Sequence, residues 1–513
     1  MSSAFETVLF TKDFDRIFKT SFNKWNYQYP NLNNDLVQIQ NVQLSELLHF
    51  LALELDSIEL SDGRKSFLLR NTDPSSDYKG VHYWQYIQSK LLPNEAAIEF
   101  VHFESTFPSR TDSTHYAALL LLPGDSSPHF IPLCEERQIE ALFPKNKTAE
   151  GISKSDLRAR YLQNLYASPG VDSLPSLYQL IWQPLEQVFE EKGVKTVYYA
   201  PSGLLHRFNL AAIAAPDKSG QTLADRYHLI PVASTRQLAA DRSEVRLPTS
   251  AIIYGGVCCD MDSLAIARAN AAWGTQDTID AAVRSGVCDD DLVGARKGAY
   301  YLYDLLTRQG INPILRSDHQ ATEESVKQIG LSAPSPGLLH FSTHGFSFPD
   351  PDGPHRILGF GGDTLVFKVS ANPLIRSGLT LAGSNYVLTN KHPMPGMEDG
   401  ILTADEVKQM NLSNTELVVL AACETGLGDI KGNEGVYGLQ RAFRIAGAKN
   451  VLVSLWTVHD EATEELMTCF YQNWLEQKMP LRVALEEAQQ WMRGQEKYRN
   501  PYYWAGFVLI GEL

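Results

Sequence analysis

The sequence predicts an α/β fold in which mostly parallel strands are flanked by helices, and two observations support this prediction. Short apolar runs alternate with longer amphipathic segments from about residue 96 to the C-terminus, as in strand–helix–strand units. The run LVVLAA at 417–422 is apolar throughout, which is typical of a strand buried on both faces of a parallel sheet. A chain of 513 residues exceeds one typical domain, so we expect two or three folded units.

The first unit, residues 1–90, is polar, and we expect it to be a short helical N-terminal region. Ser45 can cap a helix that carries Leu48, Leu51 and Leu55. A second helical face is formed by Trp84, Ile87 and Leu91.

The second unit, residues 91–240, has the alternating strand and helix pattern of an α/β domain. The runs AAIEFVHF (96–103) and YAALLLLP (116–123) predict strands, and 174–191 predicts a helix. A further strand at 196–200 ends in the turn Pro201-Ser202-Gly203.

The third unit, residues 241–513, shows the same alternating strand and helix pattern more clearly. Its expected strands are 251–254, 338–343, 417–422, 451–455 and 507–510, and its expected helices are 298–308, 436–446, 461–477 and 481–494. The segments 258–294 and 349–400 predict long loops, the second with room for a hairpin.

Composition excludes several classes of function. A net charge of −15 argues against nucleic-acid binding and suits a protein partner. Six cysteines without metal-ligand spacing indicate reduced thiols, and therefore a cytoplasmic protein without a metal. The N-terminus has no signal-peptide pattern, and the apolar runs are too short to span a membrane. We expect no cofactor and no membrane association.

Two reactive residues follow the ends of predicted strands. His344 comes after LLHFST and precedes Gly345, and Cys423 comes directly after LVVLAA. In α/β sheets, sites form beyond the carboxyl ends of the strands. A nearby imidazole can generate the thiolate that makes cysteine a good nucleophile, so the two residues are a candidate catalytic pair. The backbone N–H groups of Gly345 and Cys423 can then hold a developing oxyanion.

Other interpretations of these residues remain open at this point. Cys423 can be an ordinary buried core residue. His340 and His344 form an H-x-x-x-H pattern, but on a strand their side chains would lie about 13 Å apart, too far for one zinc ion. A serine hydrolase is disfavoured because no G-x-S-x-G occurs. The glycines between 426 and 438 match no phosphate-binding loop.

The motifs LLHFSTHGFSF, LTADEV, LVVLAACETGLGDIKGNEGVYGLQRAFRIAGAKNVLVSLWTVHDEAT and NPYYWAGFVLIG resemble the CHAT family of the caspase and separase group. The likeness is close over about 320–513 and looser upstream. It implies a caspase-like catalytic half at 241–513, preceded by a degenerate caspase-like half at 91–240. It also implies that His344 and Cys423 form the catalytic dyad, with Gly345 at the oxyanion position.

The resemblance also implies a function. We expect a cysteine endopeptidase that hydrolyses a specific protein substrate through an acyl-enzyme. A regulated role in bacterial defence is expected, such as gasdermin activation or action with a CRISPR effector, under the control of a regulatory partner. The competing functions are a non-proteolytic interaction module or scaffold, and an amidase or acyltransferase.

Substrate preference is the last expectation. Many proteases of this group prefer a basic residue before the cleaved bond, which implies an acidic pocket. In this chain Thr457 replaces the first aspartate of a similar segment in separases, and the candidate pocket carboxylates are Asp460 and Glu461. Asp460 can instead cap the helix that begins near Glu461, because acidic residues are favoured there on electrostatic grounds alone.

Overall fold

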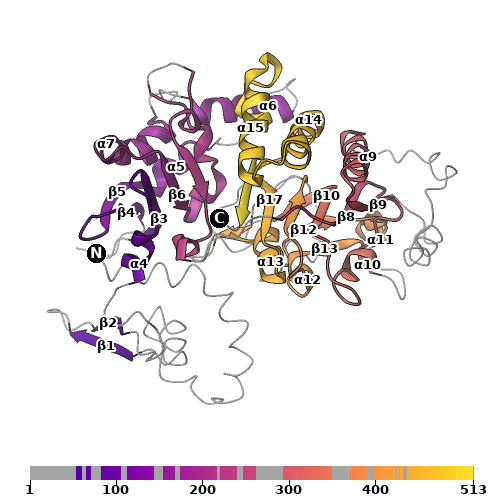
Figure 1. Cartoon of the computed structure of the whole chain (residues 1–513), viewed down its shortest axis with the longest axis horizontal. Helices are drawn as coiled ribbons and strands as arrows, with labels where there is room; N and C mark the ends of the chain where they lie inside the picture. The colour runs from indigo at the N-terminus through magenta and orange to yellow at the C-terminus, as the bar shows by residue number, and fades with distance from the viewer. Residues whose placement is uncertain are drawn as a thin grey trace.

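The computed structural model describes the chain in separate stretches. These are residues 54–59, 65–70, 83–104, 113–143, 154–167, 174–216, 220–239, 246–260, 293–348, 370, 372–390, 398–422, 425–426, 428–430 and 436–511. Figure 1 shows two large sheets side by side, each covered by helices. The predicted α/β fold class is confirmed.

The first large sheet has five strands in the order β5-β4-β3-β6-β7. Its two longest strands, β3 and β4, were both predicted as strands and form an antiparallel pair. Strands β3, β6 and β7 are parallel to one another. Helices α5, α6 and α7 lie beside it (Figure 1). The bounds are β3 Glu95–Glu104, β4 Thr114–Leu121, β5 His129–Glu135, β6 Thr196–Ala200, β7 His228–Pro231, α4 Tyr83–Ser89, α5 Glu136–Glu140, α6 Lys154–Tyr166 and α7 Gln183–Lys192.

The second large sheet has six strands in the order β18-β17-β14-β10-β8-β9. All neighbours are parallel except β17 and β18, so the prediction of a mostly parallel sheet is confirmed. The strands are β8 Ser250–Val257, β9 Asn312–Asp318, β10 Leu338–Ser342, β14 Leu417–Leu420, β17 Asn450–Ser454 and β18 Phe507–Gly511. Its main helices are α9 Val293–Arg308, α10 Glu323–Lys327, α12 Ala404–Val407, α13 Leu439–Ala446, α14 Asp460–Tyr471, α15 Leu481–Gly494 and α16 Pro501–Trp504.

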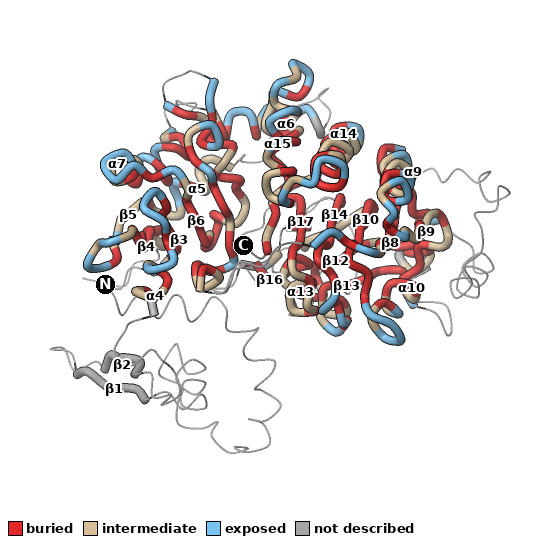
Figure 2. Tube along the Cα trace, in the orientation of Figure 1, coloured by how far each residue is buried: buried red, intermediate tan, exposed pale blue. Residues whose placement is uncertain are grey.

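Helices cover both faces of this second sheet, because successive side chains of a buried strand point to opposite faces. In β14, Leu417 and Val419 pack in the core that contains α9, α14 and α15. Val418 and Leu420 pack in the opposite core, with α12 and α13. The first of these cores continues into the five-stranded sheet, so one apolar interior joins the two sheets. Figure 2 shows the sheet strands as mostly buried beneath partly exposed helices.

A smaller three-stranded sheet continues from the end of β10. It consists of β11 Gly345–Ser347, β12 Ser377–Thr380 and β13 Ile401–Thr403, paired antiparallel. Helix α11, Ser384–Asn390, follows β12. The segment 349–400, predicted as a long loop, therefore contains a strand and a helix. Its residues 349–369, 371 and 391–397 lie outside the described residues, as does most of 258–294.

The helical prediction for the N-terminal region holds only in part. Residues Trp84, Ile87 and Leu91 are buried in and just after α4, as predicted. In contrast, β1 Glu54–Glu59 pairs antiparallel with β2 Lys65–Arg70, so the prediction of helix is wrong for these residues, including Leu55. The remaining residues of the expected Ser45 helix lie outside the described residues.

The described cysteines are not all reduced. Cys134, Cys259 and Cys469 are free, and burial raises the pKa of the Cys134 thiol to about 12. Cys258 is disulfide-bonded. The prediction of reduced thiols throughout is therefore wrong for Cys258.

The edge strand β18 has its outward-facing backbone covered by side chains. Its pairing with β17 leaves the carbonyl groups of alternate residues pointing outward. Gln489 donates to Phe507 O at 2.8 Å, and Gln237 donates to Gly511 O at 3.2 Å. Between them, Arg482 donates to Leu509 O at 3.4 Å. Side-chain donors thus make the hydrogen bonds to β18 carbonyl groups that a further strand would otherwise make.

Candidate active site

The candidate site lies where β10 and β14 end. The two strands are adjacent and parallel, with partners that differ by 79 in residue number, as in Leu338 and Leu417. Ala421 N donates to Phe341 O at 2.8 Å, so the pairing continues past the last residue of β14. His344 follows β10 and is half-buried. Cys423, which is also 79 residues after His344, lies outside the described residues.

The backbone of Gly345 is oriented by its strand pairing. Thr380 N donates to His344 O at 2.9 Å, and Phe348 N donates to Arg376 O at 2.8 Å. Hydrogen-bonded pairs alternate along an antiparallel ladder, so Gly345 and its partner Leu379 form a pair without hydrogen bonds. The N–H of Gly345 therefore points away from β12.

The residues on either side of positions 423 and 424 are anchored to β17. Gly426 N donates to Ser454 O at 2.7 Å, and Ser454 N donates to the Thr425 hydroxyl at 3.1 Å. The Ser454 hydroxyl also donates to Ala422 O. A Cβ atom on Gly426 would lie 2.9 Å from Ser454 O, so only glycine allows this approach. Sequence reasoning missed this anchor because it joins loop residues to a strand 29 positions away.

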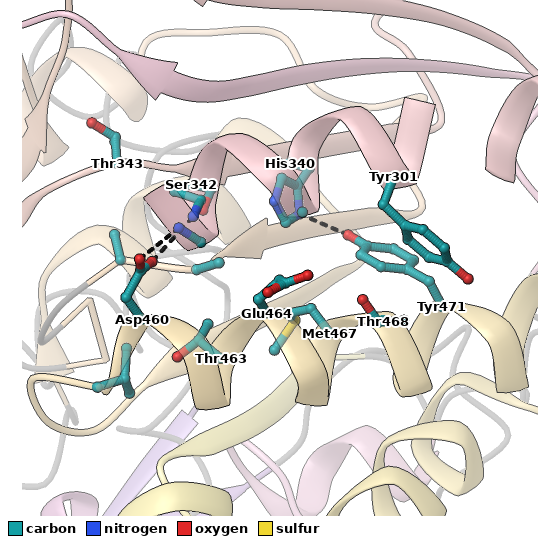
Figure 3. A pocket seen from close by; sticks show the side chains of 16 residues that line it. Tyr301, His340, Ser342, Thr343, Asp460, Thr463, Glu464, Met467, Thr468 and Tyr471 are labelled. Atoms are coloured by element: carbon teal, nitrogen blue, oxygen red, sulfur yellow. Dashed lines mark hydrogen bonds between the residues drawn. The ribbon is translucent and has the colours of Figure 1, made fainter. Parts of the chain in front are cut away.

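A small pocket of about 50 Å³ opens beside these strand ends (Figure 3). The strand ends contribute Ser342, Thr343, Ala421 and Ala422, the residues that directly precede His344 and Cys423. The opposite wall comes from α9 and α14. The helix residues that line it are Gly294, Ala295, Gly298, Tyr301, Asp460, Thr463, Glu464, Met467, Thr468 and Tyr471.

Asp460 lines this pocket and at the same time caps a neighbouring helix. Its carboxylate accepts hydrogen bonds from Gly294 N at 2.6 Å and Ala295 N at 3.1 Å, drawn as dashed lines in Figure 3. Both N–H groups lie in the first turn of α9, where backbone donors have no acceptor within the helix. The N-cap of α14 itself is His459, whose ring accepts from Ala462 N. The interpretation of Asp460 as the cap of its own helix is therefore wrong.

The two other acidic residues of this turn differ in position. Glu461 is exposed and is absent from the lining of this pocket. Glu464 is half-buried, lines the pocket, and makes no hydrogen bond or ion pair with any described residue. Sequence reasoning missed Glu464, although its spacing of four residues from Asp460 places both on one face of α14.

His340 is a buried strand residue, as predicted. Its Nδ1 lies 2.8 Å from the Tyr471 hydroxyl (Figure 3), and burial lowers the pKa of the imidazole to about 3. The neutral ring is thus held by a partner on α14. This arrangement gives no support to a zinc site shared with His344.

One acidic cluster has the composition of a metal site, but a lysine already lies among its oxygens. Glu323, Glu398 and Glu406 converge within the described part of the chain. Lys327 Nζ lies 2.7 Å from Glu323 and Glu406 oxygens and 2.9 Å from a Glu398 oxygen. The ammonium group supplies the positive charge that a cation would bring.

Among the described helices, none combines the length and apolar character needed to cross a bilayer.

Comparison with solved structures finds matches of low TM-score to a separase–securin complex and to a gingipain. The separase–securin complex of Saccharomyces cerevisiae has a TM-score of 0.45 at 9% identity, covering 99% of this chain and 34% of that one. Gingipain R of Porphyromonas gingivalis, described as an Arg-specific cysteine proteinase, has a TM-score of 0.38 at 10% identity, covering 70% and 73%.

Comparison with curated proteins finds mammalian relatives. Tetratricopeptide repeat protein 28 of Homo sapiens is 26% identical over 393 residues, or 73% of this chain. Its Mus musculus counterpart is 34% identical over 117 residues, or 23% of the chain. These matches span only 14% and 5% of the relatives' own length. The sequence profile of the CHAT domain matches residues 171–512, which is more than half of the chain. The chain therefore belongs to the CHAT domain family.

Proposed function

We propose that the chain is a cysteine endopeptidase with Cys423 as nucleophile and His344 as general base. The observation that carries this proposal is the register of β10 and β14, whose offset of 79 residues equals the separation of His344 and Cys423. If that register continued two residues beyond the last described contacts, the two positions would be level on neighbouring strands. Membership of the CHAT family supports the same assignment.

The proposed reaction proceeds through an acyl-enzyme. His344 accepts the thiol proton, and the Cys423 sulfur attacks the carbonyl carbon of the substrate. The Gly345 N–H points away from β12 and, with the N–H of Cys423, stabilises the oxyanion. His344 then gives its proton to the leaving amine as the C–N bond breaks. A water molecule, deprotonated by His344, hydrolyses the thioester and restores the thiol.

For the substrate, we propose a protein with a basic residue before the cleaved bond. The pocket next to the strand ends is lined by two carboxylates, Asp460 and Glu464. Asp460 is engaged by two backbone N–H groups, whereas Glu464 has no described partner, so Glu464 is the better placed of the two to pair with a bound Arg or Lys. Glu461, exposed and outside that lining, takes no part in this proposal.

The setting of the enzyme is also proposed. A cytoplasmic protease of this kind needs control, and a regulatory protein partner is the expected means. We expect the segments 258–294 and 349–400, which are predicted to be long loops, to gate the site. They lie largely outside the described residues, so this gating stays a prediction. The bacterial defence role also stays a prediction, since the curated relatives are mammalian proteins named for tetratricopeptide repeats. That name favours the second candidate function, an interaction module.

The test uses the full chain with a fluorogenic peptide library that varies the residue before the cut. Cys423→Ala and His344→Ala should each lower the cleavage rate at least about 100-fold, in line with the usual contribution of general-base and covalent catalysis. Cys469→Ala is the matched control, because Cys469 is a free cysteine on α14, and it should cleave like the original chain.

The same library tests the pocket. Glu464→Gln should weaken a preference for Arg or Lys more than Glu461→Gln does. Cleavage that survives in Cys423→Ala would overturn the dyad, and a preference for acidic or apolar residues would overturn the pocket. If no peptide is cut, an electrophilic peptide ketone that labels Cys423 in the original chain but not in His344→Ala would support the dyad. Absence of such labelling would favour the interaction module.

A further inference from the structure

A second cavity, of about 520 Å³, lies between the two large sheets. It shares no lining residue with the pocket beside His344. One wall comes from β6 and β7 of the first sheet, and the other from β18 and α15. Its volume falls in the range of small-molecule sites, about 300–1,000 Å³, and such sites often lie between folded units.

The feature that distinguishes this cavity is the guanidinium group of Arg482. Arg482 lines the cavity from the first turn of α15 and makes one hydrogen bond, the long contact to Leu509 O at 3.4 Å. Its Nη2 has no hydrogen-bond partner in the described part of the chain, and no described carboxylate forms an ion pair with it. An arginine carries five N–H donors, so most of this group's capacity is unused.

Two other half-buried charged residues of α15 that line the cavity, Arg493 and Glu486, already have partners. Arg493 forms a bidentate ion pair with Asp225. Glu486, one turn after Arg482, places Oε1 3.3 Å from His228 Nε2 rather than against the guanidinium. Burial also raises the pKa of Glu486 to about 7, so part of its negative charge is absent at neutral pH. Arg482 is left as a half-buried cation with one long acceptor contact, and burial lowers the pKa of its guanidinium.

We propose that the cavity binds a small molecule through a carboxylate or phosphate group placed against Arg482. The planar fork of a guanidinium matches two oxygens of such a group, and charge-assisted hydrogen bonds are strong where water is excluded. An unpaired buried charge is costly, so an incoming anion relieves a penalty that the folded chain otherwise carries. The chain's charge of −15 opposes anions at long range, so binding here depends on the local group.

The proposal is tested on the full chain with two minimal probes, inorganic phosphate and acetate, titrated at constant ionic strength. A ligand that binds only the folded state raises Tm in a saturable way. The original chain should show this rise, and Arg482→Met should bind at least about 10-fold more weakly. Arg308→Met is the matched control, because Arg308 is exposed in the last turn of α9, and it should respond like the original chain.

The outcomes are distinct. A larger response to phosphate identifies phosphate-bearing ligands, and a larger response to acetate identifies carboxylates. No saturable response to either probe, or an equal response in Arg482→Met, would overturn the proposal. If Arg482→Met does not fold, Arg482→Lys keeps the charge without the fork, and its response should be weaker; an unchanged response would overturn the proposal as well. Peptide cleavage is not measured, so the result is independent of the proposed protease activity.

Discussion

Replacing Asp460 by alanine should loosen the start of α9, although the two residues that it caps lie 166 and 165 positions away in sequence. The change removes two hydrogen bonds to a carboxylate, each contributing about 1 kcal/mol net. It also removes a negative charge from the N-terminus of a helix, which contributes about 0.5 kcal/mol. We therefore expect the free energy of unfolding to fall by about 2.5 kcal/mol.

The corresponding change in Tm is small but measurable. Unfolding entropy near 60 °C is about 2.1 cal/mol/K per residue, or about 1.1 kcal/mol/K for this chain. A loss of about 2.5 kcal/mol then lowers Tm by about 2 °C if the whole chain unfolds together, and by more if the second sheet unfolds separately. Hydrogen exchange supplies the local assay, since the amides of Gly294 and Ala295 should exchange faster.

Two further variants sharpen the test. Asp460→Asn keeps one acceptor oxygen, so it should lose roughly half as much stability as Asp460→Ala. Glu461→Ala, exposed in the same turn, should leave the exchange of Gly294 unchanged. If Asp460→Ala melts with the original chain and Gly294 exchanges no faster, the cap contributes nothing and the reasoning fails.

Three other predictions follow from the packing and the buried charges. Gly255→Ala should cost about 1–3 kcal/mol, because the new Cβ would lie 2.5 Å from Ala299 Cβ. Gly298→Ala in α9 should gain about 0.5–1 kcal/mol, because its new Cβ would make only an ordinary contact of 3.6 Å with Glu464 Cγ; equal urea midpoints would contradict this. His340, whose pKa is held near 3, should cause stability to fall as pH drops below about 6.5, and His340→Phe should lack that component in urea titrations at pH 7.5 and 5. Glu486, whose pKa is raised to about 7, should cause stability to fall as pH rises from about 4.5 to 8, and an identical pH profile in Glu486→Gln would rule this out.

Much of the second half could be predicted because its strands and helices are long, apolar and locally consistent. The helix predicted at 481–494 has those bounds in the structure, and the strand predicted at 451–455 is shifted by one residue. The strand-end position of His344 also follows from local sequence, since β10 ends two residues before it.

What could not be predicted depends on contacts distant in sequence. Helix α9 begins at Val293, five residues before the predicted start, because Asp460 satisfies its first N–H groups. Local capping rules allow Asp460 to cap its own helix, because a single segment does not show that a distant helix end needs acceptors for its first N–H groups. The unpaired Nη2 of Arg482 depends in the same way on distant contacts, because its cavity is lined by β6 and β7 of one sheet and by β18 of the other.

The covering of β18 limits how this protein can recognise an extended chain. Proteins often bind peptides by adding a strand to an open sheet edge, using backbone hydrogen bonds for affinity. At β18 the outward carbonyl groups of Phe507, Leu509 and Gly511 already have side-chain donors. A peptide, or a second copy of the chain, would have to displace all three donors before it could pair with this edge strand. Strand addition would instead take place at β9, the strand at the opposite edge of the same described sheet.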